Sequence, residues 1–573
     1  MYKIGTGKAE IKCFKPGVGM MGYGMPHHKA VTQESIVYAR AFAVEHPETG
    51  TRFVFVNTES AFVTMAMKQA VLDRLTAQYP HWGYNHSNCL FTAQHTHSAP
   101  GGYSHYAIYN MSIPGFQPVV FNANVDAIFE SVVQAENNKK DGDIRVGNGM
   151  FDENHEVAFN RSLPAYNQNP DVEKLEPTQT HLALERQMNL IRFDGADGKP
   201  LGQANFFGVH TTSLPNNRLK ISGDNKGWAS VYFEEYLAKT GNPDAIAVFA
   251  QEACGDVSPN FHGKGKDWKR GKYKDDLKSC QYTGELQYKK AAEIFEAIKS
   301  TAPLNGGIDC ELVFADLGNT VADPKFANGE KNAKTAPPAM GLAFIKGTPI
   351  DGRGIPDWLA RITTGVVANS KKKMLKRAKA EGEEAYKHRL EVFEAQGNKE
   401  IVNENGERRV LGYSDVSKLF VPSFADPLIK EMKKQYRAGS LREHTWTPQI
   451  LPLQIIIVGQ LAIVGFPGEI TTVAFRRLRA QLLETLSKRG VTNLIVASYA
   501  NCYFGYCTTR EEYDLQLYEG GHTPFGKWTC AAFQTHFDYI ANEMLKPDDD
   551  RKLDKVTMPP EFSEKELALR TYH

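Results

Sequence analysis

This sequence has few cysteines, almost no net charge and no long apolar run. Its eight cysteines include no CxxC pair, so neither a cysteine zinc site nor a dense disulfide framework is indicated. Lysine and arginine number 67 against 66 acidic residues, and this balance argues against a nucleic-acid-binding protein. The most apolar stretch, 453–466, is short and interrupted by glycine and glutamine. It predicts two buried strands joined at Gly459 and Gln460, and no transmembrane segment.

The N-terminus lacks the apolar run of a secretory signal peptide, and no repeat of fixed period is apparent. The composition is that of an ordinary globular protein, and 573 residues are enough to bury a large core. We therefore expect a cytoplasmic protein. A periplasmic or secreted protein whose signal peptide had been removed is the alternative.

Short apolar runs alternate with helical patterns along much of the chain. The run 52–56 is followed by apolar positions at helical spacing over 61–78, and a second run lies around 89–92. This order predicts an α/β fold in which a layered mixed β-sheet domain is flanked by helices. The clearest helix follows Glu469. It is capped by Thr471 or Thr472 and ended by Gly490.

Two regions depart from this pattern. Residues 365–412 are rich in lysine, glutamate and arginine, which indicates a solvated pair of helices. A basic helix that faces an anionic membrane surface is the alternative. The residues from 546 onward are charged and punctuated by proline. We predict one catalytic domain over 1–545 with a charged helical insertion at about 365–412, and a surface tail over 546–573.

Polar side chains that can carry chemistry follow several of the predicted strands. Because sites in open α/β sheets form where the strands end, these side chains are expected to converge. In chain order they are His95 and His97, His210, Glu469, and Tyr503 and Tyr506.

Histidine and carboxylate are suitable ligands for a catalytic zinc ion. On an extended strand, His95 and His97 would point to the same face, although such a pair can also be a hydrogen-bonded surface pair. Glu469 can equally cap the helix that follows it. Ser258 lies outside any GxSxG elbow, and it is either a nucleophile or a turn residue. The polar residues around Arg161 are compatible with ordinary turn chemistry.

An ordered series of segments extends from residue 3 to about 540. It comprises Lys3-Ile-Gly-Thr-Gly-Lys-Ala-Glu-Ile, Gln94-His-Thr-His-Ser-Ala-Pro-Gly-Gly, Asn160-Arg-Ser-Leu-Pro, Val209-His-Thr-Thr-Ser, Gly223-Asp-Asn-Lys-Gly-Trp, Gly255-Asp-Val-Ser-Pro-Asn, Pro467-Gly-Glu-Ile-Thr-Thr, Tyr503-Phe-Gly-Tyr-Cys and Tyr518-Glu-Gly-Gly. Together these segments resemble the neutral/alkaline non-lysosomal ceramidase family. Ala99 replaces a glycine of the family pattern, and the family's C-terminal β-sandwich domain is not apparent.

The resemblance implies a zinc-dependent amidohydrolase and assigns roles to individual residues. His97 would handle a proton beside the zinc ion, and Arg161 and Tyr518 would line the site, where either can donate a hydrogen bond to a developing oxyanion. Ser258 matches the serine often assigned as nucleophile, but we favour zinc-activated water as the attacking species. The implied zinc ligands are His95, His210, Glu469 and Tyr506.

The implied reaction is cleavage of the amide bond of an N-acyl lipid, above all ceramide to a sphingoid base and a fatty acid. Hydrolysis or synthesis of another N-acyl amine, including a biosynthetic intermediate, is the alternative, and a non-catalytic lipid-binding protein is a further one. Peripheral contact with a membrane is compatible with each of these. The sequence does not set the oligomeric state.

Overall fold

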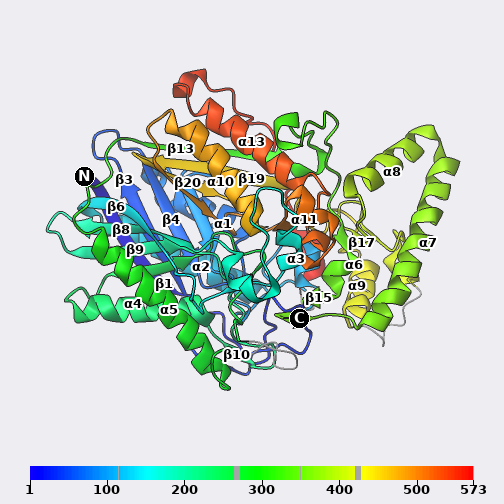
Figure 1. Ribbon diagram of the computed structural model, residues 1–573, viewed down its shortest axis with the longest axis horizontal. Helices are drawn as coiled ribbons and strands as arrows, with labels where there is room; N and C mark the ends of the chain where they lie inside the picture. Colours follow the sequence, from blue (N-terminus) through cyan, green and yellow to red (C-terminus); the bar gives the residue numbers. More distant parts are fainter. Residues whose placement is uncertain (114, 263–270, 349, 420–426, 572–573) are drawn as a thin grey trace.

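The computed structural model describes residues 1–113, 115–262, 271–348, 350–419 and 427–571. Its centre consists of two β-sheets that lie face to face, with helices on the outer face of each (Figure 1). Apolar side chains from both sheets meet between them, for example Phe42 and Phe206 from one and Ile456 and Ile463 from the other. The resulting helix–sheet–sheet–helix layering confirms the predicted layered α/β fold.

The larger sheet has eight strands and mixed direction. Its outermost pairs, β11–β9 and β4–β5, are parallel, and the strands between them are antiparallel. In spatial order the strands are β11 (Ile246–Ala250), β9 (Pro200–Phe206), β8 (Gln187–Gly195), β6 (Lys140–Met150), β1 (Tyr2–Glu10), β3 (Tyr38–Glu45), β4 (Arg52–Thr58) and β5 (Cys89–Ala93).

The smaller sheet confirms the two strands predicted around Gly459. It contains β13 (Ile308–Asp316), β19 (Ile450–Val458), β20 (Leu461–Gly465) and β22 (Asn493–Ala497). β19 and β20 form an antiparallel hairpin, and Gly459 makes its turn with a φ of 54°. A left-handed φ of this kind favours glycine, which explains the residue at the turn.

Helices cover the outer faces of both sheets. The larger sheet packs against α1 (Met65–Gln78), α2 (Pro118–Asn137), α4 (Asp224–Lys239) and α5 (Asp276–Ala297). The smaller sheet packs against α10 (Thr472–Ser487) and α13 (Thr529–Glu543). α10 is the helix predicted after Glu469. Thr471 occupies its N-cap position, but the hydroxyl of Thr471 bonds to Glu512 instead of the helix N–H groups.

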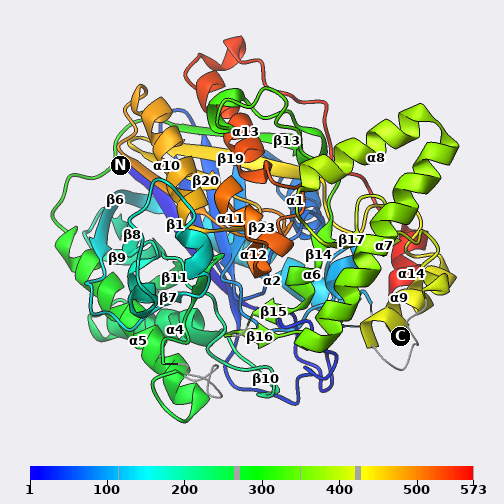
Figure 2. The ribbon, with the colours of Figure 1, turned by 45° about the vertical axis from the view of Figure 1, so that its right-hand side comes forward.

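Two further helices, α7 (Asp357–Glu381) and α8 (Glu383–Gln396), form a hairpin that stands out from the layered body (Figures 1 and 2). They coincide with much of the segment predicted as a charged helical pair, and β17 (Ile401–Glu404) and β18 (Arg409–Val410) follow them. The C-terminal segment carries α14 (Glu564–Arg570), which packs against α9 (Pro427–Ala438). None of the helices in the described ranges combines the length and hydropathy needed to cross a bilayer.

Short strands and helices in the connecting segments complete the fold. Pairs of short strands are β10 with β2, β12 with β7, β15 with β16 and β21 with β23, while β14 joins β17 and β18. Their bounds are β2 (Thr32–Gln33), β7 (Phe159–Asn160), β10 (Lys220–Ile221), β12 (Val257–Ser258), β14 (Met340–Gly341), β15 (Gly347–Thr348), β16 (Gly352–Arg353), β21 (Glu469–Ile470) and β23 (Tyr506–Cys507). The short α-helices are α3 (Leu163–Tyr166), α6 (Leu342–Ile345), α11 (Arg510–Asp514) and α12 (Tyr518–Gly521).

Candidate active site

The segments expected to converge meet at one edge of both sheets. His95 follows β5 and His210 follows β9, so the larger sheet supplies two histidines. Glu469 and Tyr506 begin β21 and β23, which follow the strands β20 and β22 of the smaller sheet. β21 and β23 pair in parallel with Glu469 opposite Tyr506. The site is therefore built from both layers.

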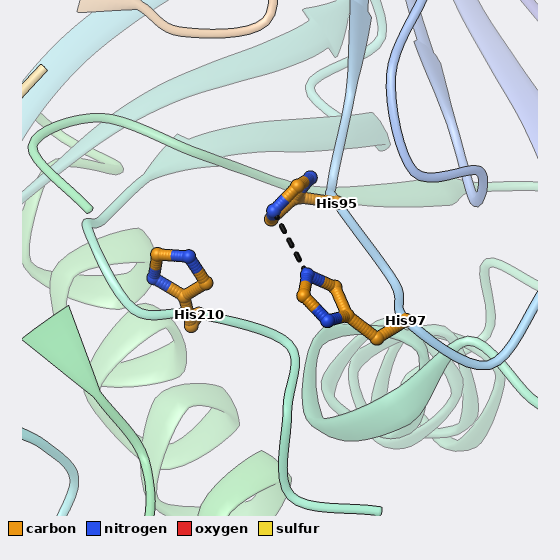
Figure 3. A group of neighbouring side chains, drawn as sticks. All are labelled: His95, His97 and His210. Carbon is orange, nitrogen blue, oxygen red and sulfur yellow. Dashed lines mark hydrogen bonds between the residues drawn. The ribbon is translucent and has the colours of Figure 1, made fainter. Parts of the chain in front are cut away.

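Three histidine rings surround one small space (Figure 3). The Nε2 atoms of His95 and His97 lie 3.0 Å apart, and His210 faces both rings from a separate loop. The expectation that an extended strand aligns His95 and His97 is wrong. β5 ends at Ala93, and His95 has a left-handed φ of 69°. The turn of the loop, and not strand alternation, brings the two rings together.

Backbone carbonyls fix the orientation of two of these rings. Nδ1 of His95 donates to the carbonyl of Ala61 at 2.6 Å, and Nδ1 of His210 donates to that of Val257 at 3.0 Å. Each Nε2 is then left as a lone-pair donor that faces the common space. Nδ1 of His97 has no hydrogen-bond partner among the described residues, so the structure does not fix its ring in the same way.

Glu469 and Tyr506 complete the set of candidate metal ligands. Glu469 Oε1 is 3.5 Å from His95 Nε2, its Oε2 is 3.0 Å from His210 Nε2, and Tyr506 Oη is 3.2 Å from the same nitrogen. In a tetrahedral zinc site with bonds of about 2.0–2.2 Å, the ligand atoms lie roughly 3.3–3.6 Å apart. The observed separations are close to that range, so these four residues fit a metal ion.

The buried oxygen Oε2 of Glu469 supports the same conclusion. Within the described residues it accepts no hydrogen bond of good geometry, although His210 Nε2 is near. Because His210 uses Nδ1 as its donor, two lone pairs face each other here, and a cation between them would satisfy both. The residues present therefore suit a bound metal on the chemistry of their donor atoms.

Protonation states at the site also suit metal binding. Burial lowers the pKa of His95 to about 4, so its imidazole is neutral at pH 7. Burial alone would raise the pKa of Glu469, but the positive charges that His95 and His210 gain on protonation, together with a 2.6 Å hydrogen bond from Tyr503, outweigh burial and hold that pKa well below its usual range. A neutral imidazole and an ionised carboxylate are the forms that bind metal.

Arg161 supports the site from behind Tyr506. Its guanidinium donates to Glu519 at 2.9 Å, to Asp351 at 2.7 Å, and to both the carbonyl of Gly255 and Tyr506 Oη. It also lies against the ring of Tyr518, 5.3 Å from the centroid. Most of its donors are thus engaged within the protein, and this arrangement favours a role in holding Tyr506 in place.

Ser258 is buried and joins the same network. Its hydroxyl donates to Asp351 at 2.8 Å, and the side-chain amide of Asn260 donates to the same carboxylate oxygen at 2.9 Å. Burial alone would raise the pKa of the Asp351 carboxyl, but the guanidinium of Arg161 outweighs burial, so the pKa is lower than usual. A carboxylate of low pKa is a poor base for activating a serine, so the geometry favours a positioning role for Ser258.

A cavity of about 410 Å³ adjoins the candidate ligands. His95, His97, Glu469, Tyr506 and Tyr518 line its polar end. The remaining walls are mainly apolar and come from α6, α7, α9, β17 and neighbouring loops, as in Leu342, Leu359, Val402 and Met432. Such a space suits an apolar chain that places a polar group at the histidines.

Sequence and structure comparisons relate this chain to known proteins. The family model for neutral/alkaline non-lysosomal ceramidase, N-terminal, matches residues 2–415 and 431–535. The chain belongs to this family. The resemblance found in the sequence motifs is thereby confirmed.

Members of this ceramidase family match over most of the chain. The neutral ceramidase of Pseudomonas aeruginosa is 32% identical over 94% of this chain and 71% of its own length. Neutral ceramidase A of Dictyostelium discoideum is 30% identical over 98% of this chain and 75% of its own length. A solved structure described as ceramidase complexed with C2 superposes with a TM-score of 0.78, at 30% identity over 98% of this chain and 77% of its own.

The structure brings the candidate residues predicted from the sequence together, and it adds several that sequence reasoning missed and that hold the cluster in place. Asp351 accepts hydrogen bonds from both Arg161 and Ser258, and Glu519 binds both Arg161 and Ser162. Asp351 precedes Gly-Arg-Gly, a pattern indistinguishable from a surface loop. Glu519 directly follows Tyr518 in the segment Tyr518-Glu-Gly-Gly. Its carboxylate in that segment was the one sequence signal that could have identified it.

Proposed function

We propose that this protein is a zinc-dependent amidohydrolase that cleaves ceramide, or a closely related N-acyl lipid, to a fatty acid and an amine. The observation that carries the proposal is the apolar cavity that adjoins the cluster of candidate ligands. The named relatives support the choice of ceramide as the substrate class. A shallow polar pocket would instead have favoured a small amide.

His95, His210, Glu469 and Tyr506 would hold the zinc ion. Bound there, zinc would polarise the amide carbonyl and lower the pKa of an attacking water molecule. Arg161 keeps Tyr506 in place through the 3.2 Å contact to its hydroxyl, and Tyr503 does the same for Glu469. These supporting bonds fix side chains that would otherwise lose conformational entropy on binding.

The reacting amide needs two further contributions, and residues beside the cavity can provide them. Burial raises the pKa of Tyr518, so its phenol stays protonated and can donate to the carbonyl oxygen as negative charge develops there. The departing nitrogen must gain a proton, and His97 lies beside the ligands at the polar end of the cavity. We assign to His97 the transfer of a proton from the attacking water molecule to the departing nitrogen, in overall hydrolysis that consumes one water molecule.

The test is a substrate panel assayed with purified protein before and after metal removal. Chelation should abolish hydrolysis and zinc should restore it, and ceramides with long acyl chains should be cleaved better than short N-acyl amines. Tyr518→Phe should lower kcat by roughly 10²–10³-fold if its hydroxyl stabilises the oxyanion. Turnover of no ceramide, or full activity in protein shown by elemental analysis to lack metal, would contradict the proposal.

The attacking group can be tested separately. With water as the attacking species, Ser258→Ala should retain measurable turnover, and the wild type should release amine without a burst. A stoichiometric burst of amine together with an acyl group on Ser258, identified by mass spectrometry, would show instead that serine attacks.

A further inference from the structure

One face of α7 exposes large apolar side chains in a regular row. Trp358, Ile362 and Val366 have exposed fractions of 65%, 57% and 44%. They are spaced four residues apart, so they lie above one another on one side of the helix. Single exposed apolar residues are normal on protein surfaces, but a row of three that includes a tryptophan marks an interaction site. We call these three residues the apolar stripe.

The apolar stripe lies directly beside the cavity. Leu359 and Thr363, which follow Trp358 and Ile362 by one residue, line the cavity wall. Successive residues of an α-helix are about 100° apart around its axis, so the stripe and the cavity wall are adjacent flanks of the same turns. A molecule that contacts the stripe would therefore meet the protein next to its substrate space.

The outer half of α7 is basic. The helix contains seven basic and two acidic residues, although the whole chain carries a formal charge of only +1. Within the described part of the chain, none of those seven forms an ion pair with a carboxylate. Lys373, Lys376 and Arg377 are exposed and continue the side of the helix that carries the stripe. The exposed face is thus apolar near the cavity and cationic farther out along the hairpin.

We propose that this face of α7 docks the protein on an anionic lipid bilayer, with the apolar stripe inserted among the headgroups and the basic residues against lipid phosphates. Apolar and cationic side chains on one helix face are the combination that binds a membrane interface. A lipid with long hydrocarbon chains resides in such a bilayer, so docking would bring the cavity to its substrate. This inference rests on the proposed function, because that function places the substrate in a membrane.

Vesicle sedimentation with the whole 573-residue chain tests the docking surface. The probes are vesicles of phosphatidylcholine alone and vesicles of phosphatidylcholine mixed with phosphatidylglycerol. Combining Trp358→Ser, Ile362→Ser and Val366→Ser should weaken binding to the mixed vesicles by roughly tenfold or more. Combining Lys373→Glu, Lys376→Glu and Arg377→Glu should remove the preference for phosphatidylglycerol and its sensitivity to salt.

A matched control changes three exposed valines elsewhere. Val31, Val119 and Val556 are 64%, 63% and 89% exposed, and none of them lines the cavity. Their replacement by serine should leave vesicle binding unchanged. The stripe variant should also cleave a short-chain ceramide in solution within about twofold of wild type, because its residues lie outside the catalytic group, while its activity on vesicle-embedded ceramide falls with binding.

The outcomes separate docking from catalysis. Unchanged vesicle binding in the stripe variant, or no binding by the wild type, would overturn the docking proposal even if ceramide is cleaved. Stripe-dependent binding without turnover of any ceramide would leave the docking surface in place and refute the proposed function. If the wild type binds no vesicles but forms a dimer that the stripe variant loses, the face contacts a second copy and not a membrane.

Discussion

The hydroxyl of Tyr503 fixes one oxygen of Glu469, the one nearer His95, and this leaves the other oxygen to face His210. Tyr503 stacks on Phe62 with ring centroids 4.5 Å apart, so its own position is held by packing. Supporting hydrogen bonds of this kind raise metal affinity because they pre-orient the ligand before the metal arrives. At the residue scale, Tyr503 should therefore matter for metal binding although it is not itself in the candidate ligand set.

Tyr503→Phe should weaken zinc binding by roughly 10–100-fold while leaving the fold intact. Competition with a chelator of known affinity measures the binding, and far-UV circular dichroism checks the fold. Tyr109→Phe is the matched control, because Tyr109 contacts the ring of Tyr503 while its buried hydroxyl has no partner among the described residues. Equal zinc affinity in the Tyr503 variant and wild type would refute the supporting role.

Single-residue roles at this site were only partly readable from the sequence. His95, His210 and Glu469 are visible as polar side chains that follow apolar runs. The hydrogen bond from Tyr503 to Glu469 joins a loop residue to the first residue of β21, 34 positions earlier in the chain, so no local pattern could reveal it. The left-handed backbone at His95 was equally hidden, because histidine at positive φ is uncommon and tertiary contacts alone impose it.

At the scale of elements, β1 and α2 pack with their backbones unusually close. A Cβ atom at Gly5 would lie 1.8 Å from the carbonyl oxygen of Ala135, and one at Gly7 would lie 1.9 Å from that of Ser131. Side-chain and backbone amides reinforce the contact, because Asn138 at the end of α2 bonds to both backbone groups of Thr6. The glycines therefore set the distance between this helix and the larger sheet.

Gly7→Ala should lower the free energy of unfolding by roughly 2–4 kcal/mol, since the added methyl group forces α2 away from β1. Urea denaturation followed by fluorescence measures the change. Gly307→Ala serves as the control, because no atom lies within 4 Å of a Cβ built there. If the two variants are equally stable, the close approach of β1 and α2 at Gly7 does not require a glycine there.

The elements best predicted from the sequence are those buried on both faces. The run 52–56 falls within β4 and the run 89–92 falls within β5, because strands between two layers need apolar residues on both sides. The helical spacing over 61–78 locates α1, which begins only at Met65 because Thr64 caps it. The pairing of β13 with β19 joins distant segments, and periodicity within either segment cannot reveal it.

At the scale of the whole molecule, ion pairs fasten the C-terminal segment to the layered body. Asp309 on β13 accepts two hydrogen bonds from Arg551, at 2.7 and 2.9 Å, and one from Arg489. Burial alone would raise the pKa of Asp309, but the two guanidinium groups outweigh it and lower that pKa. The ionised carboxylate is therefore more stable in the folded protein than in the unfolded chain.

Because the folded pKa of Asp309 is depressed, its contribution to stability is complete above the unfolded value of about 3.9 and disappears as the pH falls through the lower folded value. Asp309→Asn should cost about 1–3 kcal/mol of unfolding free energy at pH 7. The difference from wild type should shrink as the pH is lowered toward about 3. Urea titrations across this range measure it, and a difference independent of pH would show that charge is not the cause.

The candidate ligands come from both sheets, and this affects how the protein is made. His95 and His210 emerge early from the ribosome, whereas Glu469 and Tyr506 belong to the last part of the chain. A growing polypeptide can fold its first strands long before the carboxylate and phenol exist. The four candidate ligands are complete only once Tyr506 has been synthesised, and premature termination before Glu469 would leave a partly folded product with only two of the four.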